Sequence, residues 1–311
     1  MADFPQIHAA WQRRRALVRE QRLDAWRLVH GAADGMEGLS VDDYRGRYLI
    51  TVEAEAWLED RAGLEAALAE VQEELRPAFA PKFYWVANLP KQRGALPGEE
   101  IDRFEVVEDA SRFEVHLGEG PHTGLFLDQR ENRREVCKLA KGRRCLNLFC
   151  HTGAFTVAAL QGGASEAVSV DLSKNYLAWL ERNLELNELE DRPHRSVASD
   201  AAAYLERAAR GGEVFDLVIL DPPTFGRGKG STFSTIRDYG RLLAACLQIL
   251  SPSGRILACL NTRKVAAEEF RDFLKEAAKT ARRKVLRRPA PPPDFPETAG
   301  APGALKAYWI A

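Results

Sequence analysis

Residues 215–225, which read FDLVILDPPTF, decide the fold. Their apolar run LVIL lacks alternation, which is typical of a strand covered on both faces of a parallel sheet. Asp221 follows at the carboxyl end of that strand, where such sheets bind ligands. Pro222 and Pro223 end the ladder and stiffen the backbone before the ring of Phe225. This arrangement predicts either a site for a flat polar molecule or a simple strand end.

Strand and helix patterns alternate around this stretch, from residue 119 onward. Strands are expected at RCLNLFC, EAVSVD, HRSVAS, FDLVIL and RILACL, with helices near residues 154–161, 173–186, 201–210, 234–250 and 266–279. Such alternation predicts an α/β unit with a parallel sheet between two layers of helices. Near the end, KVLRR and LKAYWIA read as strands joined by a proline-rich loop, which fits a last strand running antiparallel.

A further helix is expected before the first of these strands, at LDQRENRREVCKLAKG, residues 127–142. Asp128 and Glu131 have capping-box spacing at its start, and Gly142 stands past its end.

The front of the chain does not alternate. Residues 5–23 predict a helix with five arginines, whose basic face is either solvated or turned toward RNA. Strand patterns follow at AWRLVHG, LSVDDY, RYLITVEA, FYWVAN and RFEVHLG, with an acidic amphipathic helix at residues 59–76. The sequence therefore predicts three parts: a basic helix at 1–23, a β-rich α+β domain at 24–118, and the α/β domain at 119–311.

Composition limits the function classes. The 311 residues are 45% hydrophobic and 29% charged, with a formal net charge of −1, so nucleic acid could be bound only through local basic patches, at 11–27, 130–144 and 279–288. The sequence has neither a membrane-spanning apolar stretch nor the apolar core of a signal peptide. Its five cysteines lack metal-type spacing and read as reduced thiols. We expect a cytoplasmic protein without a metal.

Three consecutive predicted strands end in acids, namely Asp171, Asp200 and Asp221. The carboxyl ends of parallel strands meet at one edge of a sheet, and an acid at the end of the second strand commonly binds ribose hydroxyls. Helix capping is the alternative for Asp171 and Asp200 taken singly.

The first strand–helix turn, NLFCHTGAFT at residues 147–156, is poor in glycine. Gly153 stands where the last glycine of a dinucleotide-binding motif would, while Phe149 and His151 fill the earlier positions. A pyrophosphate needs glycine there for close approach, so the turn favours a nucleoside without phosphate, such as S-adenosylmethionine. The predicted cofactor residues are Asn147, Phe149, Thr152, Gly153, Asp171, Leu172, Asp200, Ala201 and Asp221.

Several ordered motifs carry a family resemblance. HTGLFLDQRENRR, LNLFCHTGAFT, VDLSKNYLAWLERNLELN and FDLVILDPPTFGRGK resemble class I S-adenosylmethionine-dependent methyltransferases that modify bacterial 23S ribosomal RNA, over about residues 26–310. The resemblance implies a Rossmann-like sheet of seven strands in the order 3-2-1-4-5-7-6, behind a β-rich domain that binds the RNA substrate. It also implies that Gln129 and Arg130 help to hold the cofactor, unless they belong to a plain solvated helix face.

Two branches of that family resemble this chain, and one residue separates them. The cytosine-C5 branch attacks the base with a cysteine just after the fifth strand, and it carries a PUA domain in front, which this sequence lacks. Here the matching stretch is CLNTRK, with Thr262 at the position of the cysteine. Cys259 lies three residues earlier, on the opposite face of the strand. CLNTRK instead resembles the guanine-N7 branch, the related half of the bifunctional large-subunit enzyme.

The acid–Pro–Pro–aromatic turn by itself favours a different atom. A carboxylate and a proline carbonyl can accept the two hydrogens of an exocyclic amine, so adenine N6 and guanine N2 stay open. Guanine N7 has a lone pair and no proton, and therefore needs no base.

The sequence thus predicts methyl transfer from S-adenosylmethionine to a base of 23S ribosomal RNA, with guanine N7 preferred and S-adenosylhomocysteine as the product. Asp221, Pro222, Pro223, Phe225 and Asn261 are the expected catalytic residues: Phe225 would stack on a flipped-out base and Asn261 would hydrogen-bond it. A small-molecule methyltransferase and an inactive RNA-binding relative remain alternatives. A homodimer is possible.

Overall fold

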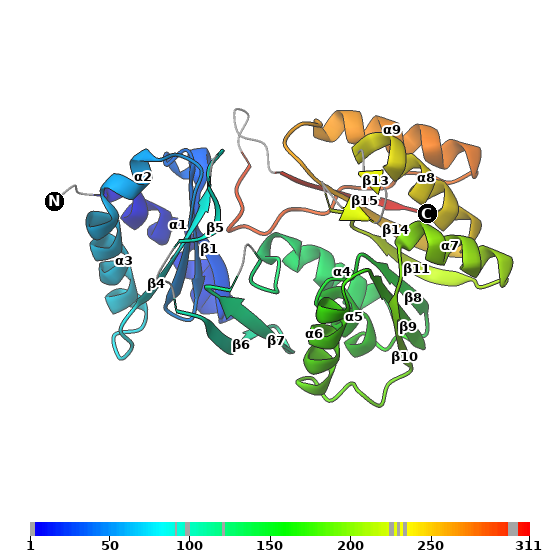
Figure 1. The fold of residues 1–311 in the computed structure, drawn as a ribbon, viewed down its shortest axis with the longest axis horizontal. Coiled ribbons are helices and arrows are strands. Elements are labelled where there is room, and N and C mark those ends of the chain that lie inside the picture. The colour runs from blue at the N-terminus through cyan, green and yellow to red at the C-terminus, as the bar shows by residue number, and fades with distance from the viewer. Residues whose placement is uncertain are drawn as a thin grey trace. The chain divides into compact units, whose positions relative to one another are not determined.

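Figure 1 shows the computed structural model of the chain, which describes residues 4–90, 92–96, 100–119, 122–223, 227–228, 231–232, 235–297 and 304–311. The chain forms two compact units, Met1–Asp128 with Pro291–Pro302 and Gln129–Ala290 with Gly303–Ala311. It therefore passes from one unit to the other three times. The predicted division differs in two places: it set the boundary at residue 119, and it assigned residues 291–302 to the α/β domain.

The first unit contains a five-stranded sheet, a two-stranded hairpin and helices. Its elements are α1 (Pro5–Gln21), β1 (Ala25–His30), η1 (Gly31–Asp34), β2 (Leu39–Tyr44), β3 (Arg47–Val52), α2 (Ala56–Glu59), α3 (Arg61–Leu75), β4 (Lys82–Asn88), β5 (Arg93–Ala95), β6 (Asp102–Glu108), β7 (Ser111–Leu117) and η2 (Leu127–Gln129). The order of the sheet is β1-β2-β3-β4-β5, in which only β3 and β4 pair in parallel. The sequence analysis missed β5, which has three residues, and β6, which has four charged residues out of seven and pairs with β7 alone among the described strands.

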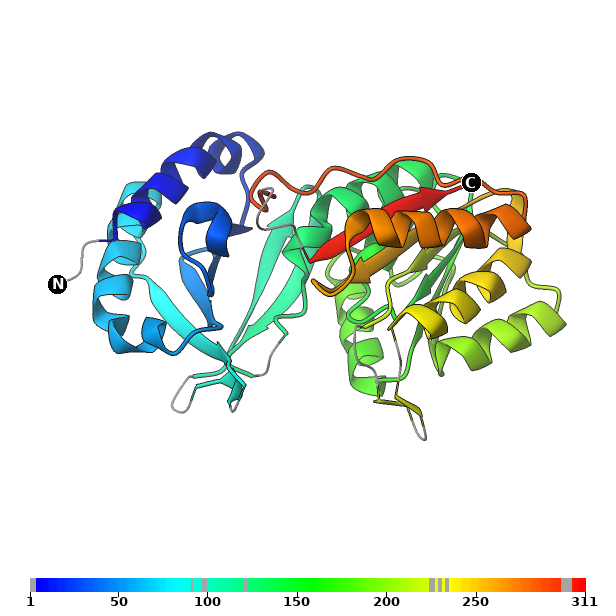
Figure 2. The same ribbon diagram turned by 90° about the horizontal axis from the view of Figure 1, so that it is seen from above.

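Helix α1 belongs to the first unit and packs beside α3, as Figures 1 and 2 show. Trp11 of α1 is fully buried, with its ring 5.7 Å from that of Trp26. Arg14 is only 3% exposed and donates to both carboxylate oxygens of Asp34, at 3.0 and 2.7 Å. The expected face of five accessible arginines was therefore wrong for Arg14, because this guanidinium is part of the core.

Residues near Asp294 complete the first unit from a distant part of the sequence. Asp294 is fully buried, and its Oδ2 accepts the backbone N–H of Arg27 at 2.9 Å. Its carbonyl accepts a hydrogen bond from Arg14 at 3.3 Å, and the Arg27 guanidinium lies over the ring of Phe295, 4.6 Å from the centroid. The proline-rich connection was predicted as an exposed loop, but part of it packs into the first unit through Asp294 and Phe295.

The second unit alternates strands and helices as predicted. Its elements are α4 (Arg130–Leu139), β8 (Arg144–Leu148), α5 (Ala154–Gln161), β9 (Glu166–Asp171), α6 (Lys174–Glu185), β10 (His194–Ala198), α7 (Ala201–Arg210), β11 (Phe215–Leu220), β12 (Arg227–Gly228), β13 (Ser231–Thr232), α8 (Thr235–Gln248), β14 (Leu250–Asn261), α9 (Ala267–Thr280) and β15 (Leu305–Ile310). Helices α7, α8 and α9 lie side by side on one face of the sheet, and α4, α5 and α6 lie on the other (Figures 1 and 2).

The sheet order is β10-β9-β8-β11-β14-β15, with β15 antiparallel to β14 and the other pairs parallel. The sixth predicted strand is short: Val285 bridges Ile310, and the backbone N–H groups of Lys284 and Leu286 donate to β15 and its end at 2.8 and 2.7 Å. This arrangement matches the expected order 3-2-1-4-5-7-6 and confirms the Rossmann-like fold.

The predicted capping box and the predicted reduced cysteines can each be compared with the structure. The capping box was wrong, because Gln129 rather than Asp128 is the N-cap of α4, and no side-chain cap bond forms there. All five cysteines are among the described residues, and none is in a disulfide bond. In the described part of the chain, no helix is long and apolar enough to cross a membrane.

Candidate active site

The three predicted acids lie along one edge of the sheet in the second unit. Asp171 is the last residue of β9, Asp200 stands two residues after β10, and Asp221 directly follows β11. Leu148, the last residue of β8, pairs with the last residue of β11 and the penultimate residue of β9, so these strands end level. The strand order reverses between β8 and β11, and ligands of open α/β sheets bind at such a point.

Asp171 joins the two turns that follow β8 and β9. Its Oδ2 accepts the backbone N–H of His151 at 2.9 Å, and its Oδ1 accepts that of Ser173 at 2.9 Å. Ser173, not Asp171, is the N-cap of α6, and its hydroxyl accepts from Tyr176 N at 3.3 Å. The capping alternative is therefore excluded for Asp171. Each of its oxygens retains acceptor capacity, because a carboxylate has about four lone-pair sites.

The turn after β8 has an unusual backbone. Phe149 and His151 have φ angles of +57° and +51°, in the left-handed region that glycine normally occupies. Each such residue costs about 1–2 kcal/mol. The chain thus keeps a glycine-type turn with two large rings at the positions of the missing glycines. The ring of His151 lies 4.2 Å from that of Tyr176, measured between centroids.

Gly153 is the one position of this turn where only glycine fits. Its φ is +80°, and a Cβ added there would lie 2.3 Å from Cγ of the buried Leu180 on α6. The absence of a side chain at Gly153 therefore allows α6 to pack against the start of α5. This is the helix-packing role expected of the last glycine in such a turn.

Asp221 is held from the start of α4. Gln129 donates from Nε2 to Oδ2 of Asp221 at 2.8 Å, and Asn132 donates in turn to Oε1 of Gln129. Gln129 and Asn132 are 3% and 4% exposed, and Arg130 is fully buried. These side chains are therefore not a solvated helix face, which excludes the plain alternative for Gln129 and Arg130.

Asp200 differs from the other two acids, because it is exposed and acts as a helix cap. Its Oδ1 accepts Ala203 N at 3.0 Å at the start of α7. Ala201 is 4% exposed. Leu172 is 55% exposed directly after Asp171, so it offers apolar surface beside that carboxylate.

Asn147 and Thr152 face the protein interior. Asn147 donates from Nδ2 to Thr156 Oγ1 at 2.9 Å, and this hydroxyl lies 2.7 Å from that of Ser169. The carbonyl of Thr152 accepts a hydrogen bond from the fully buried Asn183 at 2.9 Å. Both predicted residues therefore help to hold the turn from behind, and a contact with a ligand would have to use their remaining groups.

The structure describes only part of the predicted catalytic set. Pro222 is buried and Pro223 is exposed. Asn261 is exposed at the carboxyl end of β14, the strand next to β11. Phe225 lies outside the described residues.

The sequence analysis missed a buried lysine beside the turn after β14. Lys306 is 2% exposed, and its ammonium group donates to the carbonyl oxygens of Thr262 and Ala304. Thr262 is 7% exposed, and its hydroxyl accepts Lys264 N at 3.2 Å. The sequence did offer a signal for Lys306, namely a single lysine within a short, otherwise apolar strand. The sequence analysis also missed Asn132 and Asn183. Each is a polar residue on a buried helix face, and this was again the available signal.

Burial keeps the Cys150 thiol and the Tyr176 hydroxyl, both near the turn, neutral. It raises the pKa of the Cys150 thiol well above its ordinary value, and it also raises the pKa of the Tyr176 hydroxyl, with a further contribution from Asp171 in each case. Cys150 is therefore not a thiolate at neutral pH. Within the described residues, no group of three or more His, Cys, Asp or Glu side chains is arranged to hold a metal ion.

Two curated proteins are similar to this chain. One is a ribosomal RNA large subunit methyltransferase from Deinococcus radiodurans, with 36% identity over 84% of this chain and 65% of that protein. The other is ribosomal RNA large subunit methyltransferase K from Neisseria meningitidis serogroup B, with 34% identity over 80% of this chain and 72% of that protein. About a third of each relative lies outside the match.

A solved structure and a family model agree with these matches. The crystal structure of SMU.776 complexed with SAH is 29% identical, with a TM-score of 0.89 over 98% of this chain and 80% of that chain. The model of the S-adenosylmethionine-dependent methyltransferase family matches residues 27–310, almost the whole length of this chain. Together with the sheet order and the acids at its edge, this match shows that the chain belongs to the family of S-adenosylmethionine-dependent methyltransferases.

Proposed function

We propose that this protein transfers a methyl group from S-adenosylmethionine to a base of 23S ribosomal RNA, and that guanine N7 is the acceptor. The names of the two similar curated proteins support ribosomal RNA of the large subunit as the substrate class. The observation that carries the choice of a nitrogen is Thr262, because it stands where an enzyme that methylates cytosine C5 needs a cysteine.

The residues at the strand ends suit S-adenosylmethionine. The carboxylate oxygens of Asp171 each accept one backbone N–H and can also accept the ribose hydroxyls. The exposed Leu172 offers an apolar surface for adenine. Phe149 and His151 replace the glycines that a pyrophosphate needs, which favours a nucleoside without phosphate.

When bound, S-adenosylmethionine supplies an electrophilic methyl group that already carries a good leaving group. The task of the protein is then mainly positioning. Gln129 holds the Asp221 carboxylate, whose negative charge would favour a sulfonium nearby. The buried Pro222 stiffens the turn that follows, and the exposed Asn261 stands at the carboxyl end of β14, where its amide could meet a base edge. Guanine N7 brings its own lone pair, so the reaction needs no general base.

Methylation of cytosine C5, the alternative reaction, would lack its cysteine nucleophile at the expected position. Cys259 is fully buried within β14, and its neighbours Ala258 and Leu260 pack into the core beneath α7, α8 and α9. Strand alternation therefore directs Cys259 to the other face. Attack on cytosine C6 would require an accessible thiolate.

Methylation of an exocyclic amine is the second candidate, and Asp221 favours it. The Asp221 carboxylate, which accepts from Gln129 at Oδ2, has about four lone-pair sites, so this carboxylate and the Pro222 carbonyl could accept the two hydrogens of an amine. The product identity separates this candidate from guanine N7, because the two reactions leave the methyl group on different atoms.

Nucleoside mass spectrometry tests the proposal directly. Purified protein and isotopically labelled S-adenosylmethionine are incubated with protein-free 23S ribosomal RNA from a strain that lacks the gene. Labelled 7-methylguanosine is expected, whereas N2-methylguanosine or N6-methyladenosine would establish the second candidate. RNA that contains 5-fluorocytosine provides a control, since a denaturant-resistant protein–RNA adduct would support methylation of cytosine C5 instead. Labelling of small molecules alone would overturn an RNA substrate.

Phe225 remains a proposed base clamp. Stacking of an aromatic ring on a base contributes about 1–3 kcal/mol. Phe225→Ala should therefore reduce methyl transfer to RNA by about tenfold or more while the affinity for S-adenosylhomocysteine stays the same. A variant that melts much earlier yet turns over normally in the cold would identify Phe225 as a core residue instead.

A further inference from the structure

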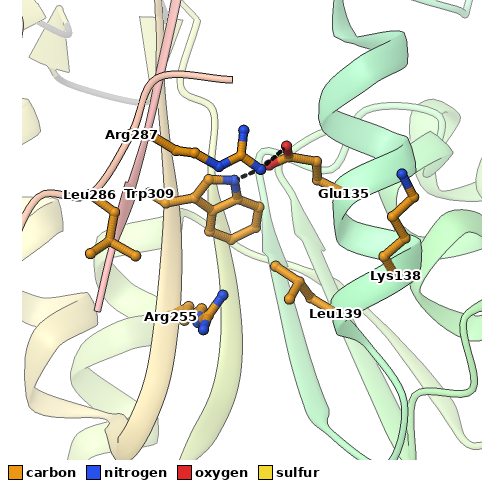
Figure 3. A pocket seen from close by; sticks show the side chains of 7 residues that line it. All are labelled: Glu135, Lys138, Leu139, Arg255, Leu286, Arg287 and Trp309. Atoms are coloured by element: carbon orange, nitrogen blue, oxygen red, sulfur yellow. Dashed lines mark hydrogen bonds and ion pairs between the residues drawn. The ribbon is translucent and has the colours of Figure 1, made fainter. Parts of the chain in front are cut away.

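A pocket of about 310 Å³ opens in the second unit, between α4 and the β14–β15 edge of the sheet (Figure 3). It is lined by Glu135, Lys138, Leu139, Arg255, Leu286, Arg287 and Trp309. Arg255 pairs in register with Leu217, three residues before the end of β11. The pocket therefore lies toward the amino ends of the parallel strands, away from the edge that carries Asp171 and Asp221.

The single carboxylate of the pocket is already neutralised. Glu135 accepts hydrogen bonds from the guanidinium of Arg287 and from the indole N–H of Trp309, as the dashed lines in Figure 3 show. Lys138 and the half-buried Arg255 form no hydrogen bond or ion pair with any residue that the structure describes. Two cations of this pocket thus lack an internal counter-charge. A half-buried guanidinium without a partner favours an anion from outside.

The rest of the lining is apolar. Leu286 is 48% exposed, so it offers apolar surface at the pocket. In Figure 3 the indole of Trp309 and the side chain of Leu139 point into the space between strand and helix. A small inorganic anion would not use these surfaces, whereas a nucleobase presents a flat apolar face next to a phosphate.

Two basic stretches that are far apart in the sequence both contribute side chains to the lining of the pocket. Residues 130–144 contribute Lys138 from α4, and residues 279–288 contribute Arg287 from the segment beside β15. The volume lies at the lower end of the range of about 300–1,000 Å³ that is typical of small-molecule sites. It suits one nucleotide rather than a folded partner.

We propose that this pocket binds one unpaired nucleotide of the RNA substrate, away from the methylated base. The base lies against Trp309, Leu139 and Leu286, and the adjacent phosphates bind Arg255 and Lys138. This inference rests on the proposed RNA substrate and adds a second point of attachment on the same unit. Such a contact would set the position of the RNA strand and raise affinity without touching the cofactor.

The salt dependence of RNA binding tests the proposal. Binding of protein-free 23S ribosomal RNA is measured by filter retention over a series of potassium chloride concentrations, for Arg255→Glu and Lys138→Glu. Arg210→Glu is the matched control, since it gives the same change in net charge and Arg210 is exposed on α7. Among the described residues, its side chain bonds only to the Glu206 carbonyl of its own helix, at 3.3 Å. Each pocket variant should bind about tenfold more weakly at low salt and reduce the salt slope by about one.

Two further readouts separate the possible outcomes. The affinity for S-adenosylhomocysteine should not change in the pocket variants, and RNA that contains 4-thiouridine should crosslink to the peptides that carry Leu139 or Trp309. If Arg255→Glu does not fold, Lys138→Glu still tests the proposal. Lys138 is exposed on the surface of α4, so its substitution should not disturb folding.

An unchanged salt slope with normal methyl transfer would overturn the nucleotide pocket and leave the proposed function intact. Wild-type protein that neither binds nor methylates the RNA would overturn both. A loss of binding that appears only with assembled ribosomal particles would point to a protein partner and would also overturn the RNA pocket.

Discussion

Gln129 and Asp221, 92 residues apart in the sequence, are joined by a hydrogen bond of 2.8 Å between Nε2 and Oδ2. The bond ties the N-cap of α4 to the residue that directly follows β11. Because Asn132 holds the other end of the Gln129 amide, the carboxylate of Asp221 is oriented by a short chain of buried polar groups. Such support is what a site needs if its geometry is to be maintained during catalysis.

Gln129→Glu should impair methyl transfer more than Gln129→Met. The glutamate would place a second carboxylate against Asp221, and two like charges raise the pKa of one of them. Activity of Gln129→Glu should therefore recover as the pH falls and one group takes up a proton, whereas Gln129→Met should show no such recovery. The measurement is the rate of methyl transfer to 23S ribosomal RNA as a function of pH. Identical pH profiles for the two variants would refute the coupling of Gln129 to Asp221.

Asp171→Ala should weaken the binding of S-adenosylhomocysteine by about 1–3 kcal/mol, because the ribose hydroxyls would lose the acceptor that we propose for them. It also removes the bonds to the backbone of His151 and Ser173, so a decrease in melting temperature is expected as well. Asp200→Ala is the comparison, and it should mainly cost the helix cap on α7, about 0.5–2 kcal/mol of stability. Calorimetry that finds unchanged affinity for Asp171→Ala would limit Asp171 to joining the turns.

Gly153→Ala should destabilise the second unit more than Gly212→Ala. Both glycines have positive φ angles, +80° and +69°, and should share a backbone cost of about 1–2 kcal/mol. Only at Gly153 would the new methyl group collide with Leu180, while nothing lies within 4 Å of the corresponding position at Gly212. The collision should add about 1–3 kcal/mol. Urea unfolding measures the difference, and equal losses would mean that α6 moves aside without cost.

His30 should make the first unit sensitive to acid. Burial, and then the charge of Arg27, lower the pKa of His30 to about 4. The unfolded chain has its ordinary pKa near 6.5, so it takes up the proton first as the pH falls. The stability contributed by neutral His30 is complete above about pH 6.5 and is lost between there and pH 4.

His30→Gln should therefore lose less stability than the wild type between pH 7 and pH 5, as measured by urea unfolding. A wild type and a His30→Gln variant with parallel pH dependence would contradict the role of His30.

Most elements of the second unit could be predicted because most of its strands are buried and most of its helices are amphipathic. The run from Leu217 to Leu220 is almost completely buried, so its composition reflects its environment directly. Strand β6 lacks that signal, since it pairs with a single neighbour and stays partly exposed. The segment at Val285 was predicted as a strand, but it forms only one bridge to β15 within the described residues and has solvent-exposed neighbours.

The acids of the candidate site could also be predicted, but their connections could not. The position of Asp171 after a strand was readable, whereas its bonds to His151 and Ser173 depend on the path of two turns. The left-handed backbone at Phe149 runs against the preference of the residue type, so no local rule indicates it. The bond from Gln129 to Asp221 depends on tertiary packing across 92 residues.

The placement of Pro291–Pro302 in the first unit limits how this protein can be taken apart. A protease that cut the chain only between Asp128 and Gln129 would leave two covalent connections between the units, so neither would be released. Expression of residues 1–128 alone would remove Asp294 from its bonds to Arg14 and Arg27 and expose a buried surface. Exchange of either unit between genes would therefore require three breakpoints, one at each passage of the chain from one unit to the other.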